Sequence, residues 1–161
     1  MSRTTFSGPV KSGTNRYAPY QNVGTTVLSQ SVPFTFDATL VQNVTFYVPA
    51  GSKILNVYVD VITAYDSATS ATLSAGKTSG GTQYVSGVNV KTTARTTPTF
   101  TTTQLTNMQS TPVDVSAQTT GSDAVSAIVV TITSVGQPTA GTGFFTMQYI
   151  QSDDRSTYST Q

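Results

Sequence analysis

Two overlapping stretches and a set of carboxylates are the parts of this chain whose residue types could do chemistry. Gly76-Lys77-Thr78 matches the end of a phosphate-binding loop, and Ser74-Ala75-Gly76-Lys77 has the S-x-x-K spacing of a serine nucleophile. The phosphate loop needs a glycine five positions before Gly76, where Ala71 stands, and a helix directly after it. The serine chemistry needs S-D-N and K-T-G motifs, which this sequence lacks. We therefore interpret residues 76–81 as a hairpin loop.

The acidic side chains are all aspartates, because the chain contains no Glu. A pair of carboxylates could hydrolyse a glycoside or hold calcium. However, no D-x-D-x-D spacing occurs, and no Trp is present to form a platform for a sugar. For Asp66, Asp114 and Asp123 we expect the ordinary role of an Asp near a turn, which is to accept hydrogen bonds from backbone amides. A calcium ion at a loop stays an alternative. The full set is Asp37, Asp60, Asp66, Asp114, Asp123, Asp153 and Asp154.

The side chains that usually run chemistry near neutral pH are scarce. The chain has no His, no Cys and no Glu, and only 9% of its residues are charged. Imidazole bases, thiol nucleophiles and most metal ligands are therefore missing, and we expect no enzyme, no cofactor and no metal site. The net charge of +1 gives no field that would attract nucleic acid. No apolar run is long enough to span a bilayer, so we expect no membrane partner either.

Composition favours an all-β fold in a chain of 161 residues, which suits one domain with a sizeable core. Ser and Thr make up about a third of the chain, and Thr is β-branched, whereas the helix formers Lys, Arg and Glu are few. Short strand signals separated by turns every eight to twelve residues or so predict an antiparallel β-sandwich or jelly roll of about eight strands. No helical period is long enough to predict a helix.

The individual strands are predicted from alternation of apolar and polar residues. Residues 53–64 give the clearest signal, with Leu55, Val57, Val59 and Val61 expected on one face. Residues 42–48, 71–74, 83–90, 113–117 and 144–150 give further strands, and residues 25–29 and 33–36 give two short candidates. Residues 125–133 are apolar on both faces, which predicts a central strand. Residues 91–103 are nearly free of apolar side chains and predict a surface loop or a weak edge strand.

The first 24 residues differ in character from the rest and predict an extended N-terminal arm before a β-sandwich domain at 25–150 and a polar C-terminal tail at 151–161. The arm has Gly and Pro residues without periodicity, three of the eight cations, no Asp and three aromatics. It is either a frayed terminus or an arm that lies on a partner. The second alternative is kept because disordered tails seldom carry three aromatics. The residues expected to bind the partner are Arg3, Phe6, Lys11, Arg16, Tyr17 and Tyr20.

Three runs of the sequence resemble short virion proteins of tailed bacteriophages: SRTTFSGPVKSG at the start, VPAGSKILNVYVDVITAYDSATSATLSAG in the middle and GFFTMQYI at the last strand. The resemblance covers most of the chain and involves no catalytic motif. Such proteins are often capsid decoration (cement) proteins, which have β-sandwich or jelly-roll folds, are commonly trimeric and brace neighbouring capsomers. Others are components of fibres or tails.

The resemblance implies a capsid decoration protein that binds the major capsid protein and further copies of itself as a homotrimer, and the low-charge, Thr-rich composition agrees with a protein that works by surface contact. Its location would be the virion, assembled in the host cytoplasm. The main alternative is a fibre or tail-tip domain that binds host glycan through the loops 65–70, 76–84 and 92–103, with Tyr65 and Tyr84 among its surface aromatics. A glycan or peptidoglycan hydrolase is a third hypothesis, and it requires two or more Asp residues in one cleft.

Overall fold

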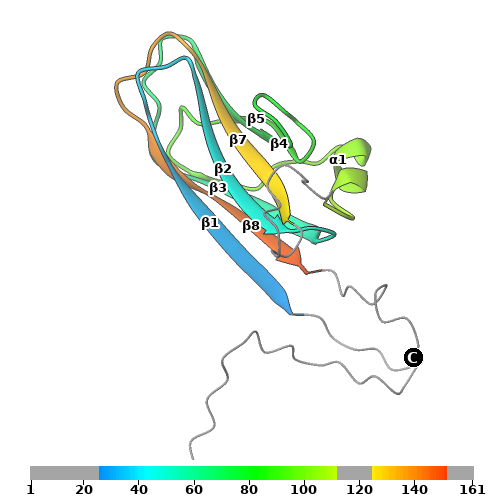
Figure 1. The fold of residues 1–161 in the computed structure, drawn as a ribbon. Coiled ribbons are helices and arrows are strands. Elements are labelled where there is room, and N and C mark those ends of the chain that lie inside the picture. Colours follow the sequence, from blue (N-terminus) through cyan, green and yellow to red (C-terminus); the bar gives the residue numbers. More distant parts are fainter. Residues whose placement is uncertain (1–25, 112–124, 152–161) are drawn as a thin grey trace, which may run out of the picture.

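The structure is a computed structural model that describes residues 26–111 and 125–151 of the 161 (Figure 1). The strands in these residues are β1 (Val27–Thr35), β2 (Val41–Pro49), β3 (Lys53–Thr63), β4 (Ser70–Gly76), β5 (Val85–Asn89), β6 (Arg95–Thr96), β7 (Val125–Val135) and β8 (Thr142–Ile150). One short helix, α1 (Thr102–Asn107), follows β6. Over the described residues, no helix has the length and apolar character needed to cross a membrane.

The strands form two antiparallel sheets of four, in the orders β1-β8-β3-β6 and β2-β7-β4-β5, which lie face to face (Figure 1). The chain crosses from one sheet to the other at every connection except the β4–β5 hairpin. The first strand pairs with the last, and the pairing nests inward through β2–β7, β3–β6 and β4–β5. This nested pairing is the strand order of a jelly roll. The predicted all-β antiparallel sandwich of about eight strands is confirmed.

Alternate residues of each strand build the core between the sheets. The ring centroids of Phe46 on β2 and Phe145 on β8 lie 5.7 Å apart, so these two side chains join the sheets across the interior. The predicted alternation is confirmed in β2, β7 and β8, and β7 has a paired strand on both sides, as expected for a central strand. The buried apolar residues of β7 and β8 are Ile128, Val130, Ile132, Phe145, Met147 and Tyr149.

The predicted inward face of residues 53–64 is wrong at Leu55. The register of β3 against β8 shifts between Ile54 and Asn56, so Leu55 lies in a β-bulge that alternation cannot reveal. Ile54 takes the inward position at 3% exposure, and Leu55 is 39% exposed. The three valines that follow face the core as predicted.

The two short strands expected at 25–29 and 33–36 form one strand, β1, although Pro33 lies within it. β1 is the outermost strand of its sheet, and a proline is tolerated on an edge strand where its missing N–H points away from the neighbouring strand. The gap expected between the two candidates, at residues 30–32, is therefore wrong, since these residues pair with β8 like the rest of the strand.

The segment predicted as a loop or weak edge strand, residues 91–103, contains the two-residue strand β6 and leads into α1, which was not predicted. Thr101 and Gln104 form a capping box. The backbone N–H of Gln104 donates to Thr101 Oγ1 at 3.2 Å, and the backbone N–H of Thr101 donates to Gln104 Oε1 at 2.9 Å. Gln104 Nε2 also donates to the Thr82 carbonyl at 3.1 Å, which ties α1 to the β4–β5 loop. The strand predicted at 113–117 lies outside the described residues.

Candidate functional site

The six arm residues expected to bind a partner all precede the described part of the chain, which begins at residue 26. Their role stays a prediction. The residues concerned are Arg3, Phe6, Lys11, Arg16, Tyr17 and Tyr20. The geometry that can be described belongs to the two sheets and to the loops that join them.

The stretch that matched parts of a phosphate loop and of a serine nucleophile is a hairpin loop, as expected. Gly76 ends β4, and the chain returns as β5 from Val85 without an intervening helix. The Gly80 amide donates to Thr131 Oγ1 on β7 at 2.8 Å, so the loop folds back over the outer face of its own sheet. Phosphate chemistry therefore has no helix N-terminus to use here.

The predicted turn role of Asp66 is confirmed. Its carboxylate accepts hydrogen bonds from the Thr139 amide at 2.7 Å, from Thr139 Oγ1 at 2.5 Å and from the Ala140 amide at 3.0 Å. These bonds, led by the one from the Thr139 side chain, lower the pKa of Asp66 to about 2. Asp66 therefore joins the β3–β4 loop to the β7–β8 loop as a fixed anion.

The other described aspartates are engaged separately. Asp37 accepts a hydrogen bond from the Thr39 amide within its own turn at 2.9 Å, and Asp60 lies on the outer face of β3. Within residues 26–111 and 125–151, no three His, Cys, Asp or Glu side chains come together as metal ligands would. The remaining four aspartates, including Asp114 and Asp123, lie outside these ranges. The absence of a catalytic role stays a prediction.

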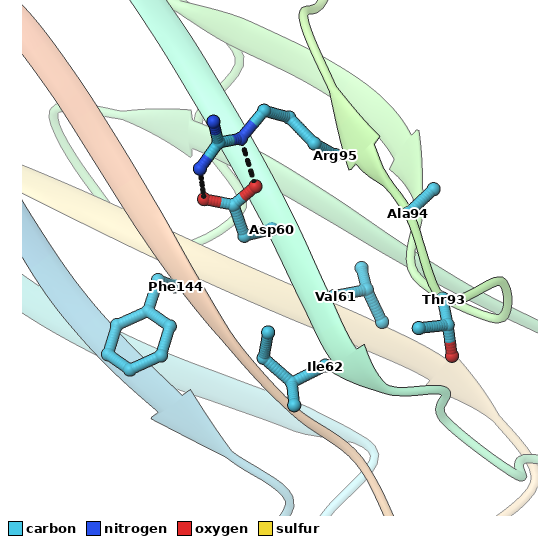
Figure 2. Close-up of a pocket in the computed structure, with 7 residues that line it drawn as sticks. All are labelled: Asp60, Val61, Ile62, Thr93, Ala94, Arg95 and Phe144. Carbon is cyan, nitrogen blue, oxygen red and sulfur yellow. Dashed lines mark hydrogen bonds and ion pairs between the residues drawn. The ribbon is translucent and has the colours of Figure 1, made fainter.

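Asp60 forms a two-pronged ion pair with Arg95 across the β3–β6 ladder (Figure 2). Arg95 Nε lies 2.6 Å from Asp60 Oδ1, and Arg95 Nη2 lies 3.0 Å from Oδ2. The hydrogen bond from Arg95 lowers the pKa of the Asp60 carboxyl, so the pair stays charged at neutral pH. The guanidinium carbon also lies 6.0 Å from the centroid of the Tyr58 ring. Arg95 is thus held in one orientation although its side chain is 73% exposed.

Beside this ion pair, the outer face of the β1-β8-β3-β6 sheet has a shallow groove of about 580 Å³ (Figure 2). Phe144 on β8 and Ile62 on β3 present their side chains there at 45% and 59% exposure. One row of cross-strand neighbours, Pro33, Phe144, Asp60 and Arg95, runs over all four strands of the sheet. Exposed aromatic and arginine side chains are the types enriched in protein interfaces. We call Ile62, Phe144, Asp60 and Arg95 the contact face.

Two of the aromatic residues expected on the surface of the glycan-binding loops are buried. Tyr65 is 2% exposed, and its hydroxyl donates to Gln42 Oε1 at 3.0 Å. Tyr84 is fully buried below the β4–β5 loop. Both tyrosines belong to the core, so the expectation that they lie on the surface is wrong. A position beside a loop does not fix the direction of a side chain.

Comparisons with known proteins assign this chain to no family. No protein-family model matches the chain, and no curated protein matches it. A solved structure described as the cyanophage Pam1 capsid asymmetric unit contains a chain with 18% sequence identity to this one. The match covers 91% of this chain and 100% of that chain, with a TM-score of 0.49. We therefore base the proposed function on the strand order, the contact face and the sequence resemblance.

Proposed function

We propose that this chain is a structural protein of a tailed-bacteriophage virion, and more narrowly a capsid decoration protein. In this role it binds the outer surface of the head and braces neighbouring capsomers. Its partners are the major capsid protein and further copies of itself, for which the resemblance to phage virion proteins implies a homotrimer. It works by burying surface against other proteins, without a cofactor.

The observation that carries this proposal is the contact face. Phe144 and Ile62 are apolar, exposed and side by side, and the neighbouring Arg95 is already ordered by Asp60 and Tyr58. When a partner buries Arg95, this side chain therefore loses little further rotamer freedom. The jelly-roll strand order and the sequence resemblance to phage virion proteins agree with this role, and neither alone would identify it.

The test uses heads of the phage that encodes this protein, from which the copies of the protein already present have been removed. It measures how much purified protein sediments together with these heads. We expect the full chain to bind, and deletion of residues 1–20 to abolish binding while the domain stays folded. Phe144→Asp should weaken binding about thirty-fold or more, since loss of a hot-spot side chain costs about 2 kcal/mol or more.

Leu105→Asp is the matched control, because Leu105 is 47% exposed on α1 whereas Phe144 is 45% exposed on the contact face. The control should bind heads like the wild type. Equal losses for both variants, or no binding of the full chain, would overturn the proposal. Saturable glycan binding without head binding would favour the fibre or tail-tip alternative instead.

A further inference from the structure

The two lateral sides of the sandwich are built differently. On one side, residues 90–111 run along the free edge of β3: the Val61 amide donates to the Ala94 carbonyl at 2.9 Å, and the Ile54 amide donates to the Met108 carbonyl at 2.8 Å. On the opposite side the outermost strands are β1 and β2, and the two make little contact with each other. In the sheet β1-β8-β3-β6, the chain itself therefore covers the edge beside β3, and β1 is the edge strand on the opposite side.

The register of β1 identifies which of its backbone groups face outward. β1 and β8 pair without a bulge, and the Phe36 amide donates to the carbonyl of the opposite residue, Gly141, at 2.8 Å. Because hydrogen-bonded and non-hydrogen-bonded pairs alternate in an antiparallel ladder, the even-numbered residues of β1 bond to β8. The odd-numbered residues therefore point their N–H and C=O groups away from the sheet. Pro33 is one of them, as its missing N–H requires.

The outward edge is blocked at one end and open at the other. Pro33 has no N–H to offer, and the Thr35 carbonyl already accepts a hydrogen bond from Gln42 Nε2 on β2. Across the described residues, no other segment bonds the outward backbone groups of Val27, Ser29 and Ser31. The open edge is thus the five residues 27–31, with three outward-facing residues.

The side chains of β1 also become more exposed from the blocked end of the strand toward the open end. Phe34, at the blocked end, is 2% exposed, whereas Leu28, which also points inward, is 37% exposed and Val27 is 50% exposed. β1 contains no charged residue, although charges and prolines are the usual protection of a free edge. An uncharged open edge with apolar side chains beneath it is a template for another strand.

We propose that residues 27–31 of β1 pair antiparallel with the same residues of a second copy, about a twofold axis at Ser29. In this register Val27 lies opposite Ser31 of the other copy, and Ser29 lies opposite its counterpart. All three outward residues of each copy then exchange hydrogen bonds with an outward residue of the other. A shift by two residues would set Val27 opposite either Pro33 or Ser29 and leave fewer of these groups paired.

Two features favour a second copy over an unrelated strand. The open edge is self-complementary, because its three bonding residues are symmetric about Ser29, and an interface about a twofold axis requires this. No charge lies on β1, so two copies can approach without like-charge repulsion. The pairing joins two four-stranded sheets into one of eight strands. It needs no capsid, and a trimer held by another surface would leave this edge free to link trimers in pairs.

The test compares oligomeric mass in solution by analytical ultracentrifugation between about 5 and 500 μM, a range that suits an interface of this small size. Ser29→Pro removes the outward N–H at the axis. The β1–β8 ladder should be kept, because position 29, like Pro33, points its N–H away from β8. We expect half the wild-type mass for Ser29→Pro and the wild-type mass for the control Ser29→Thr.

A charge exchange tests the twofold axis itself. Ser29→Lys and Ser29→Asp should each halve the mass, because like charges then face each other across the axis, and an equal mixture of the two should regain it. Circular dichroism checks that each variant is folded. An unchanged mass for folded Ser29→Lys, or no recovery in the mixture, would overturn the twofold pairing, even if the protein binds heads as proposed. Loss of association on deleting residues 1–20 alone would assign the edge to the N-terminal arm instead.

Discussion

Replacing Tyr84 by Phe should stabilise this protein, whereas the same replacement at Tyr65 should destabilise it. Both tyrosines are buried, at 0% and 2% exposure. The Tyr65 hydroxyl donates to Gln42 Oε1 at 3.0 Å, whereas the Tyr84 hydroxyl has no hydrogen-bond partner in the described structure. A buried polar group without a partner keeps its desolvation penalty, so removing it lowers the free energy of the folded state.

The magnitudes follow from the same comparison. An unpaired buried hydroxyl costs about 1–3 kcal/mol, and the small void left by one oxygen atom offsets part of this, so Tyr84→Phe should gain about 1 kcal/mol. Tyr65→Phe loses one hydrogen bond and leaves Gln42 Oε1 without it, which should cost about 1 kcal/mol. The melting temperatures should move by roughly 3 °C in opposite directions. Urea unfolding at pH 7, followed by circular dichroism, gives the free energy of each variant.

The two tyrosines also predict how stability depends on alkaline pH. Burial raises the pKa of Tyr84 from 10.0 to about 12, and burial with the nearby Asp37 charge raises the pKa of Tyr65 to about 12. Because burial disfavours the ionised phenolate in the folded state, stability is unaffected by these two groups below pH 10 and falls as the pH rises from 10 to 12. Ionisation of each buried tyrosine over this interval should therefore lower the free energy of unfolding by up to about 3 kcal/mol. Tyr84→Phe should therefore lose less stability than the wild type over this interval. A variant that is less stable than the wild type at pH 7 and equally sensitive to alkali would refute the reasoning.

Two further predictions concern single positions. Asp66→Asn should loosen the β3–β4 and β7–β8 loops, because the carboxylate that accepts from Thr139 is lost; hydrogen exchange should rise in both loops. Since the pKa of Asp66 is lowered to about 2, its contribution is present above pH 4 and is lost as the pH falls from about 4 to 2, so the acid transition should be shallower in Asp66→Asn. Gly143→Ala should lower the free energy of unfolding by about 2 kcal/mol or more, because the new Cβ would overlap the Phe34 ring and the Asp60 carbonyl oxygen. Urea titration measures this loss, and wild-type stability would show that β8 can shift to make room.

Much of the fold could be predicted because each core strand repeats every two residues. Residues 125–133 and 144–150 keep the two-residue period without a bulge of their own, and their inward faces are those expected. Leu55 could not be placed, because a bulge shifts the period without leaving a mark in residue type. The helix α1 could have been found, since Thr101 and Gln104 have the spacing of a capping box, but six residues are too few for a helical period.

The contact face is harder to predict, because Ile62, Phe144 and Arg95 come from three strands that become neighbours only in the folded sheet. One signal was present. Phe144 and Phe145 are consecutive in a strand, and successive side chains point to opposite faces, so one of the two rings had to face outward. Which ring it is follows from the core, where Phe145 packs against Phe46.

The shortage of charge explains how this protein holds its surface in order. Long charged side chains lose much rotamer freedom when a partner buries them, whereas Ser and Thr lose little. Here a short hydroxyl side chain joins two exposed strands that are far apart in the sequence, since Ser31 Oγ lies 2.7 Å from Thr146 Oγ1. A surface built from short, already bonded side chains is rigid before it meets a partner. The same composition leaves the β1 edge without the lysines that would keep other strands away. A partner strand therefore meets, at Ser29, a backbone that is exposed and ordered by β8 from behind.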